Sequence, residues 1–375
     1  MTDDMQWDAE ELFLSGDAFF ERVFSEVRGV RRSIDVEVYI FNGDEVGRMA
    51  EDALIGAAAR GARARLLVDG IGSRAWIASS GARLRATGVD VRVYHPLWPF
   101  SRLVNRRNHR KTWILDGRAA FVGSMNVAAV HSERVSGGSA WQDAAVRVEG
   151  PEISALQAAF EQAWSRGRAP DGQRVDRTLN QRKWIDRLRG RGPKPALLVR
   201  LNYTQSLRRR SFHDFLARLT GARRSVWIAN PYLVPSPIVL RALARARKAG
   251  ADVKILVPQS SDVFFMRWVA TAFYGPLVRA GAEVYEYLPR FLHQKSTVVD
   301  DWATVGTSNM NTRSLLHDLE VDVVLSHRES VRELATAFEA LLKDAVRVDP
   351  GRQTWRARLA GVLGRAVTFF FRHWI

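Results

Sequence analysis

Two stretches of this 375-residue chain carry one pattern: His-x-Lys, an Asp five residues after the Lys, and then Gly-x-x-Asn. The first copy consists of His109, Lys111, Asp116, Gly123 and Asn126, and the second of His293, Lys295, Asp300, Gly306 and Asn309. A single His-x-Lys would carry little information in a chain so rich in basic residues. Two copies with nearly the same spacing indicate that one structural unit occurs twice.

Segments upstream of the two motifs also align with one another. Residues 29–36 resemble 221–228, residues 61–68 resemble 250–257, and residues 88–94 resemble 281–287, in the same order in each half. A repeat of this length is a domain used twice, not a solenoid unit. The length of the chain agrees, because 375 residues are too many for one ordinary core.

Strand and helix patterns alternate within a repeat. Residues 34–41, 64–69 and 89–94 are expected to be strands, and residues 44–60 a helix that Gly61 ends. This order predicts the α/β class, with helices covering a mainly parallel sheet. We expect a first repeat over 1–165, a basic linker over 166–195, a second repeat over 196–345 and an amphipathic tail over 346–375.

Composition narrows the class of protein. With 46% hydrophobic residues and 13 prolines the chain is expected to be globular, and the absence of Cys excludes disulfides and thiolate chemistry. A formal charge of +16 implies an anionic partner. The acidic N-terminus does not resemble a signal peptide, and no apolar run approaches the roughly 18 residues of a membrane span.

The residue types of the motif suit attack on a phosphorus atom. One imidazole can act as nucleophile while a second transfers the proton of the departing or arriving oxygen. An ammonium and a carboxamide can hold the non-bridging oxygens. The candidate catalytic residues are His109, Lys111, Asp116, His293, Lys295 and Asp300, and the candidate phosphate-binding residues are Asn126, Asn309, Ser124 and Ser308.

Each motif is expected to form a β-hairpin. In the first, alternation places His109 and Lys111 on one strand face, and Asp-Gly at 116–117 signals a two-residue turn. The motif aspartates then lie near the turns and brace them without touching substrate. Because the second hairpin is one residue shorter before its Gly, Asn309 is expected to be displaced, with Asn311 as the alternative donor.

A carboxylate follows each motif, Asp143 after the first and Glu320 after the second. Either can fix the tautomer of a catalytic imidazole, although the sequence leaves open which carboxylate orients which His, and an ordinary salt bridge is the alternative. No cluster has recognisable metal-ligand spacing, so neither a metal nor another cofactor is expected. The other histidines are interpreted as structural or surface groups: His95, His131, His213, His317, His327 and His373.

The paired motifs resemble those of the phospholipase D superfamily, over about residues 12–342. Residues 39–47, 67–73, 146–151 and 229–235 further resemble bacterial cardiolipin synthases, in the short form without N-terminal transmembrane helices. The resemblance implies two tandem α/β/α sandwich repeats with one active site at their pseudo-twofold interface. It also implies a metal-free phosphohistidine mechanism, in which His109 is the nucleophile and His293 the general acid and base.

The function implied is transfer of a phosphatidyl group from a phospholipid to an alcohol such as phosphatidylglycerol, which makes cardiolipin or a related lipid. The alternatives are a phospholipase D-type hydrolase or nuclease, and a non-catalytic binding module. The expected partners are anionic membrane phospholipids, namely phosphatidylglycerol and also phosphatidylethanolamine, and not nucleic acid. Arg, Trp and Phe in the tail favour a peripheral location on the cytoplasmic face of the bacterial membrane, although a helix packed on the body would also explain them.

Overall fold

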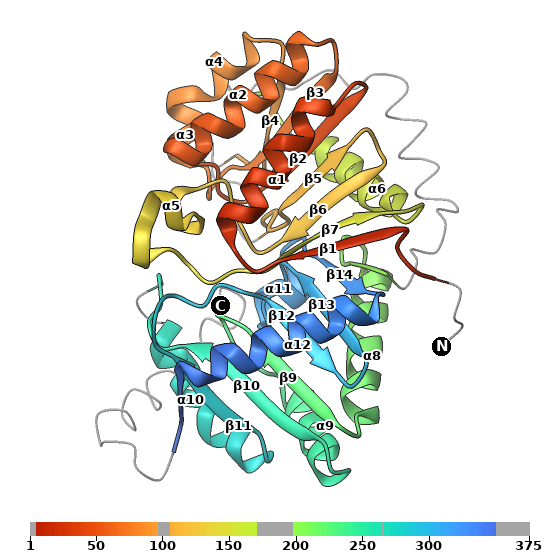
Figure 1. Cartoon of the computed structure of the whole chain (residues 1–375), viewed down its shortest axis with the longest axis vertical. Coiled ribbons are helices and arrows are strands. Elements are labelled where there is room, and N and C mark those ends of the chain that lie inside the picture. The colour runs from red at the N-terminus through yellow and green to blue at the C-terminus, as the bar shows by residue number, and fades with distance from the viewer. Residues whose placement is uncertain (1–4, 97–105, 171–197, 264–265, 350–375) are drawn as a thin grey trace.

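The computed structural model describes residues 5–96, 106–170, 198–263 and 266–349. Nearly all of the predicted linker (166–195) and of the predicted tail (346–375) lies outside these residues. Two sheets with their helices lie one above the other, and the chain completes the first before it enters the second (Figure 1). None of the described helices is long and apolar enough to cross a bilayer.

The first sheet has the strand order β1-β7-β6-β5-β2-β3-β4. Its strands are β1 (Ala9–Phe13), β2 (Ser33–Val38), β3 (Arg63–Asp69), β4 (Asp90–Tyr94), β5 (Thr112–Leu115), β6 (Ala119–Gly123) and β7 (Ala145–Glu149). The helices of this half are α1 (Gly16–Gly29), α2 (Glu45–Ala59), α3 (Arg74–Trp76), α4 (Ala82–Arg85), α5 (Glu133–Ser136) and α6 (Ile153–Trp164).

The second sheet follows the equivalent order, β8-β14-β13-β12-β9-β10-β11, and adds β15 at the far edge. Its strands are β8 (Val199–Leu201), β9 (Ser225–Ala229), β10 (Asp252–Pro258), β11 (Glu283–Tyr287), β12 (Ser296–Val299), β13 (Trp302–Gly306), β14 (Val321–Leu325) and β15 (Ala345–Arg347). Its helices are α8 (Gln205–Gly221), α9 (Pro237–Lys248), α10 (Met266–Arg279), α11 (Thr312–Leu316) and α12 (Arg328–Lys343).

The prediction of a mainly parallel sheet is wrong. In the first sheet β2, β3 and β4 are parallel neighbours, whereas β5, β6, β7 and β1 are joined by antiparallel pairs. The connections between strands explain the mixture. Helix α2 connects β2 to β3, which allows these strands to run parallel, whereas a short turn joins β5 to β6 and makes them antiparallel. Each sheet is therefore mixed, and its antiparallel half carries the motif.

Helices cover both faces of each sheet. In the first repeat, buried residues of α1 and α2 share one core cluster with β2, whereas buried residues of α6 belong to a cluster with β5, β6 and β7. That second cluster continues into the other repeat, where it includes Val305 and Val323. The antiparallel strands β6 and β7 contact β13 and β14, so the two repeats share one continuous core.

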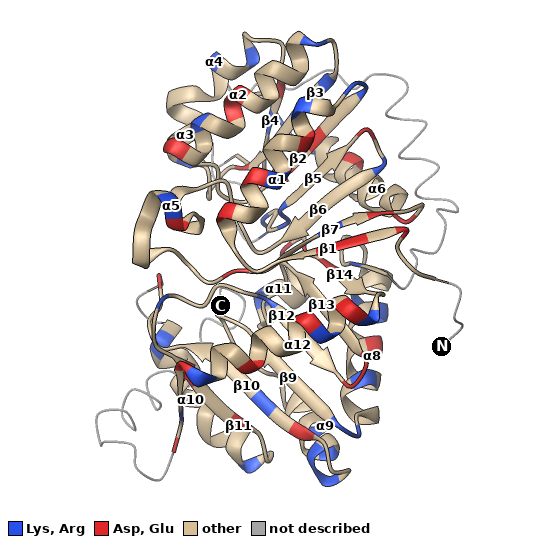
Figure 2. Ribbon diagram, viewed as in Figure 1, with Lys and Arg blue, Asp and Glu red and all other residues tan. Residues whose placement is uncertain are grey.

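Local signals explain the best-predicted helix, α2. The side chain of Asp44 accepts a hydrogen bond from the backbone N–H of Gly47 at 3.1 Å and so caps the first turn. Gly61, with φ of +87°, ends the helix in the left-handed region as expected. Charged residues collect on outer helices such as α9, where Arg241, Arg245, Arg247 and Lys248 are exposed and no acidic residue is present (Figure 2).

The two hairpins differ in length as the sequence predicted. Leu115 pairs with Ala119, which leaves a three-residue loop in place of the expected two, whereas Val299 pairs with Trp302 across a two-residue loop. The strand of the first hairpin begins at Thr112, so the catalytic residues before it precede the ladder.

Asp116 and Asp300 hold these loops in the same way. The carboxylate of Asp116 accepts backbone N–H groups of residues 31–33 at 2.8–3.1 Å, and that of Asp300 accepts those of residues 223–225 at 2.8–3.0 Å. Burial alone would raise the pKa of each carboxyl, but the three backbone donors outweigh it and lower both pKa values. Their place at the far ends of the hairpins fits bracing without substrate contact.

We expect Asp116→Ala to reduce the free energy of unfolding by about 2 kcal/mol, because three backbone donors lose a charged acceptor. The lowered pKa means that the contribution is complete above the ordinary value near ~4 and is lost as pH falls through the folded value. Urea unfolding at pH 7 and pH 3 measures both effects. Asp301→Ala, in the loop of the second hairpin and with a side chain that is 86% exposed, is the control and should change stability little. Equal loss in both variants would contradict the bracing role.

Candidate active site

The two motifs meet where each passes the other repeat. Asn108 forms a parallel bridge with Leu319, and Gln142 forms the equivalent bridge with Leu292. Just beyond these bridges the backbone N–H of His109 donates to the carbonyl of Leu319 at 3.0 Å. The motifs are thus fixed at the interface by backbone hydrogen bonds that cross it in both directions.

Each motif histidine is held by a carboxylate of the opposite repeat. His109 Nδ1 donates to Glu320 Oε2 at 3.0 Å, and His293 Nδ1 donates to Asp143 Oδ1 at 2.7 Å. An ionised carboxylate can only accept, so each ring carries its proton on Nδ1 and keeps the lone pair of Nε2 for chemistry. The exchange answers the question that the sequence left open, namely which carboxylate orients which ring.

Burial decides the charge of these groups. Burial lowers the pKa of His109 to about 4, although Glu320 opposes the shift, and burial together with the charge of Lys295 lowers the pKa of His293 well below its usual value. Burial alone would raise the pKa of either carboxyl, but the histidines bonded to them outweigh it and lower both values. At neutral pH the site therefore holds two neutral imidazoles, each bonded to a carboxylate.

Lys111 and Lys295 are the cations of the site. Each is buried, and each Nζ donates to the carbonyl of its own motif histidine at 2.6 Å. Burial lowers the pKa of Lys111 to about 7, and burial together with the charge of Lys111 lowers that of Lys295 well below its usual value. Two desolvated lysines near one another favour binding of an anion, because a bound anion stabilises the charged form of both.

The two motif asparagines are held differently. Asn126 Oδ1 accepts the backbone N–H of Ile40 at 3.0 Å, which fixes the carboxamide. Asn309 Oδ1 is buried and has no hydrogen-bond partner within the described residues. Asn311, the alternative donor, instead caps α11, since its Oδ1 accepts the N–H of Ser314 at 2.9 Å.

The predicted phosphate contact of Ser124 does not fit its hydrogen bonds. Ser124 is fully buried, and its hydroxyl lies 2.6 Å from Asp143 Oδ1 and 3.1 Å from the carbonyl of Ala144. We therefore assign it to support of Asp143. Its counterpart is Thr307, whose hydroxyl lies 2.6 Å from Glu320 Oε2, whereas Ser308 is linked by its backbone N–H to Asp322 at 3.1 Å.

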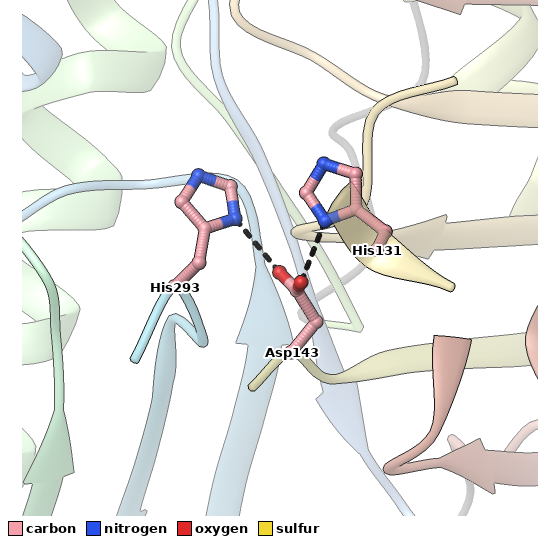
Figure 3. A group of neighbouring side chains, drawn as sticks. All are labelled: His131, Asp143 and His293. Carbon is pink, nitrogen blue, oxygen red and sulfur yellow. Dashed lines mark hydrogen bonds and ion pairs between the residues drawn. The ribbon is translucent and has the colours of Figure 1, made fainter. Parts of the chain in front are cut away.

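His131, interpreted from the sequence as structural or surface, lies in the site. Its ring is buried, and Nδ1 donates to Asp143 Oδ2 at 2.7 Å, so one carboxylate holds two imidazoles (Figure 3). The ring centroids of His131 and His293 are 5.4 Å apart, and Trp141 packs against both. No local motif marks His131, because its partner Asp143 follows 12 residues later and its role depends on the fold.

These three side chains form a group whose spacing could hold a metal ion, which the sequence did not indicate. The Nδ1 atoms of both rings point at separate oxygens of Asp143 at hydrogen-bond distance (Figure 3). That arrangement uses the donor atoms for one another. We therefore interpret the group as a hydrogen-bonded unit.

Buried ion pairs and hydrogen bonds fix the segment around His109. Glu37 of β2 accepts from Arg110 at 3.0 Å and from Asn108 at 2.9 Å. Asp69, at the end of β3, bonds to the Arg107 guanidinium and to the backbone N–H of Asn108. Two carboxylates of the parallel strands thus fix the residues that flank His109. The Asp69 carboxylate also accepts the backbone N–H of Ile71 at 2.9 Å and so supports the turn that follows β3.

The chain is similar to known proteins over most of its length. The profile of the family described as "Cardiolipin synthase, PLD-like domain" matches residues 24–164 and 215–342. Cardiolipin synthase B of Salmonella typhimurium is 34% identical over 97% of this chain and 87% of its own length. Probable cardiolipin synthase YwiE of Bacillus subtilis is 30% identical over 90% of this chain, which spans only 66% of that relative.

Two solved structures share the fold. Phosphatidylserine synthase of Haemophilus influenzae matches with a TM-score of 0.71 over 98% of this chain and 95% of its own, at 13% identity. Polyphosphate kinase of Porphyromonas gingivalis matches with a TM-score of 0.59 over 96% of this chain and 55% of its own, also at 13% identity. The fold class predicted from the sequence is confirmed, and the chain belongs to the PLD-like cardiolipin synthases, an enzyme family of the phospholipase D superfamily.

Proposed function

We propose that this chain is a phosphatidyltransferase that moves a phosphatidyl group from a phospholipid to an alcohol, with phosphatidylglycerol as the acceptor that yields cardiolipin. The observation that carries the proposal is the exchange of carboxylates between the histidines, which leaves the Nε2 lone pair of each ring available for chemistry at the interface of the two repeats. The family and its named relatives support lipid chemistry over the nuclease alternative.

The proposed reaction has two displacements. In the first, His109 Nε2 attacks phosphorus, the bond from phosphorus to the leaving oxygen breaks, and His293 supplies a proton to that oxygen. In the second, His293 takes the proton of the acceptor hydroxyl, the acceptor oxygen attacks phosphorus, and the bond to His109 breaks. Lys111, Lys295 and the two motif asparagines hold the non-bridging oxygens in both steps.

We further propose a peripheral position on the cytoplasmic face of the bacterial membrane, with anionic phospholipids as partners. The formal charge of +16 supports binding to an anionic surface, and an enzyme that acts on lipids has to reach a membrane surface. The predicted tail, with its Arg and aromatic residues, lies outside the described residues from position 350 on.

Lipid mass spectrometry tests the proposed function. Purified protein with vesicles of phosphatidylglycerol should produce cardiolipin and glycerol. Release of phosphatidic acid without cardiolipin would indicate a hydrolase, and cleavage of single-stranded DNA without lipid turnover would indicate a nuclease.

The two histidines are expected to differ in function. With a p-nitrophenyl phosphodiester, whose leaving group needs no proton, His293→Ala should still form a phosphohistidine, and His109→Ala should form none. Peptide mass spectrometry at alkaline pH locates the adduct. His213→Ala, at an exposed position, is the control and should behave as wild type. An adduct on His293 would reverse the assignment.

Anion binding is expected to weaken as pH rises through 7. The lowered pKa of Lys111, about 7, means that its ammonium is present below this pH and is lost above it. A phosphodiester keeps one negative charge throughout, so its KM should rise by up to about tenfold per pH unit above 7. Lys111→Met should bind weakly and lose this dependence. A wild-type KM that is constant from pH 6 to 9 would contradict the assignment of the charge.

His131 is expected to act through Asp143 on the proton donated by His293. His131→Phe should reduce kcat about 100-fold for a lipid, whose leaving oxygen needs a proton, but much less for a p-nitrophenyl diester. His131→Asn places an N–H near the position of Nδ1 and should restore most activity. Ser314→Ala, which removes the hydroxyl 2.6 Å from Glu320 Oε1, is the matched control in the other repeat. Equal losses on both substrates would indicate a role in folding alone.

A further inference from the structure

The two repeats differ on one face of their motif hairpins. Across β5 and β6 of the first repeat, Trp113 pairs with Phe121. At the equivalent place on β12 and β13 of the second repeat, Thr297 pairs with Thr304. The second repeat has therefore replaced two large aromatic side chains by two small ones.

The helix that packs against this pair of side chains also differs between the repeats. In the first repeat α1 fills the space, since Phe19 lies 5.9 Å from Phe121 and Phe24 lies 6.1 Å from Trp113 between ring centroids. In the second repeat the equivalent helix is α8, of which Leu219 is the buried residue, whereas its phenylalanines are half-buried. A cavity of about 160 Å³ remains between α8 and the sheet.

The free surface of this cavity is mainly apolar. Two of its charged lining residues are engaged within the protein, since Arg200 pairs with Asp214 and Asp322 accepts the backbone N–H of Ser308. Such groups have no need of a polar ligand. The apolar lining comes from α8, α9, β13, α11 and the segment before α11, and includes Phe212, Phe215, Val239, Trp302, Met310 and Leu315.

The same cavity is lined by Lys295, Asn309 and Glu320. These residues belong to the phosphate-binding and carboxylate groups of the candidate active site. We propose that the cavity binds an alkyl chain of the lipid substrate while the phosphate lies between the two motifs. The position of the phosphate rests on the proposed function, whereas the apolar binding site rests on the cavity itself.

Size sets the length of chain that fits. An engineered cavity of roughly 150 Å³ binds benzene, a molecule of six carbons. The cavity under α8 is of similar size and so takes a segment of about six carbons, not a whole acyl tail. Chain length should therefore matter up to about that number and little beyond it.

The first repeat supplies the substitutions for the test. Thr297→Trp with Thr304→Phe introduces the pair that fills the equivalent space around β5 and β6. Isothermal calorimetry with alkyl phosphates from methyl to octyl measures binding. In the wild type, Kd should fall by up to about fourfold per methylene until about six carbons. In the filled variant this dependence should be lost, while methyl phosphate binds as in the wild type.

Ala217→Trp, on the exposed side of α8, is the matched control and should keep the wild-type dependence. If the double variant does not fold, as judged by circular dichroism, Thr304→Phe alone carries the test. The same chain-length dependence in wild type and filled variants would overturn the proposal. Failure of every alkyl phosphate to bind would count against the proposed function instead, and 1-hexanol, bound by the wild type and not by the filled variant, would then report the cavity alone.

Discussion

The site depends on the pair of hydrogen bonds by which each repeat holds the histidine of the other. Glu320 reaches His109 and Asp143 reaches His293, so neither repeat alone orients the histidine of its own motif. The bonds are buried, and a buried carboxylate without its partner would be costly. Docking of the repeats and orientation of the catalytic rings are therefore the same event.

Exchange of this kind also explains why the interface is made by antiparallel strands. The strands β6, β7, β13 and β14 carry or adjoin the Gly-x-x-Asn segments and the carboxylates, and they contact one another across a shared apolar core. Parallel strands β2 and β3 lie further out and contribute Glu37 and Asp69, which fix the chain on either side of His109. The antiparallel half of each sheet thus forms the interface, whereas parallel strands of the first sheet support the segment around His109.

The two repeats differ in the groups that support their carboxylates. Asp143 is supported by Ser124 and His131, whereas Glu320 is supported by Thr307 and Ser314. One carboxylate thus has an imidazole where the other has a hydroxyl, so the two motif histidines lie in different surroundings. The packing around Trp113 and Thr297 shows the same divergence in the apolar layers.

The sequence predicted what lies within short spans of chain. Spacing gave the hairpins, the shorter second loop and the bracing place of Asp116, because these depend on neighbours within the repeat. It did not give the carboxylate exchange, since His109 and Glu320 are 211 residues apart. It also missed His131, whose neighbours in sequence are ordinary, and it placed Ser124 on the phosphate although the fold directs that hydroxyl to Asp143.

Burial of the site has a consequence for the proposed mechanism. Burial lowers the pKa values of His109 and His293, which keeps both rings neutral at pH 7, so the proton needed by the leaving oxygen is absent from His293. With both lysines charged, their two positive charges balance those of Asp143 and Glu320. A phosphodiester adds one negative charge, which favours protonation of His293 and keeps the lysines charged. The substrate thus supplies the electrostatic condition for loading the general acid, and a neutral ligand of the same shape would not.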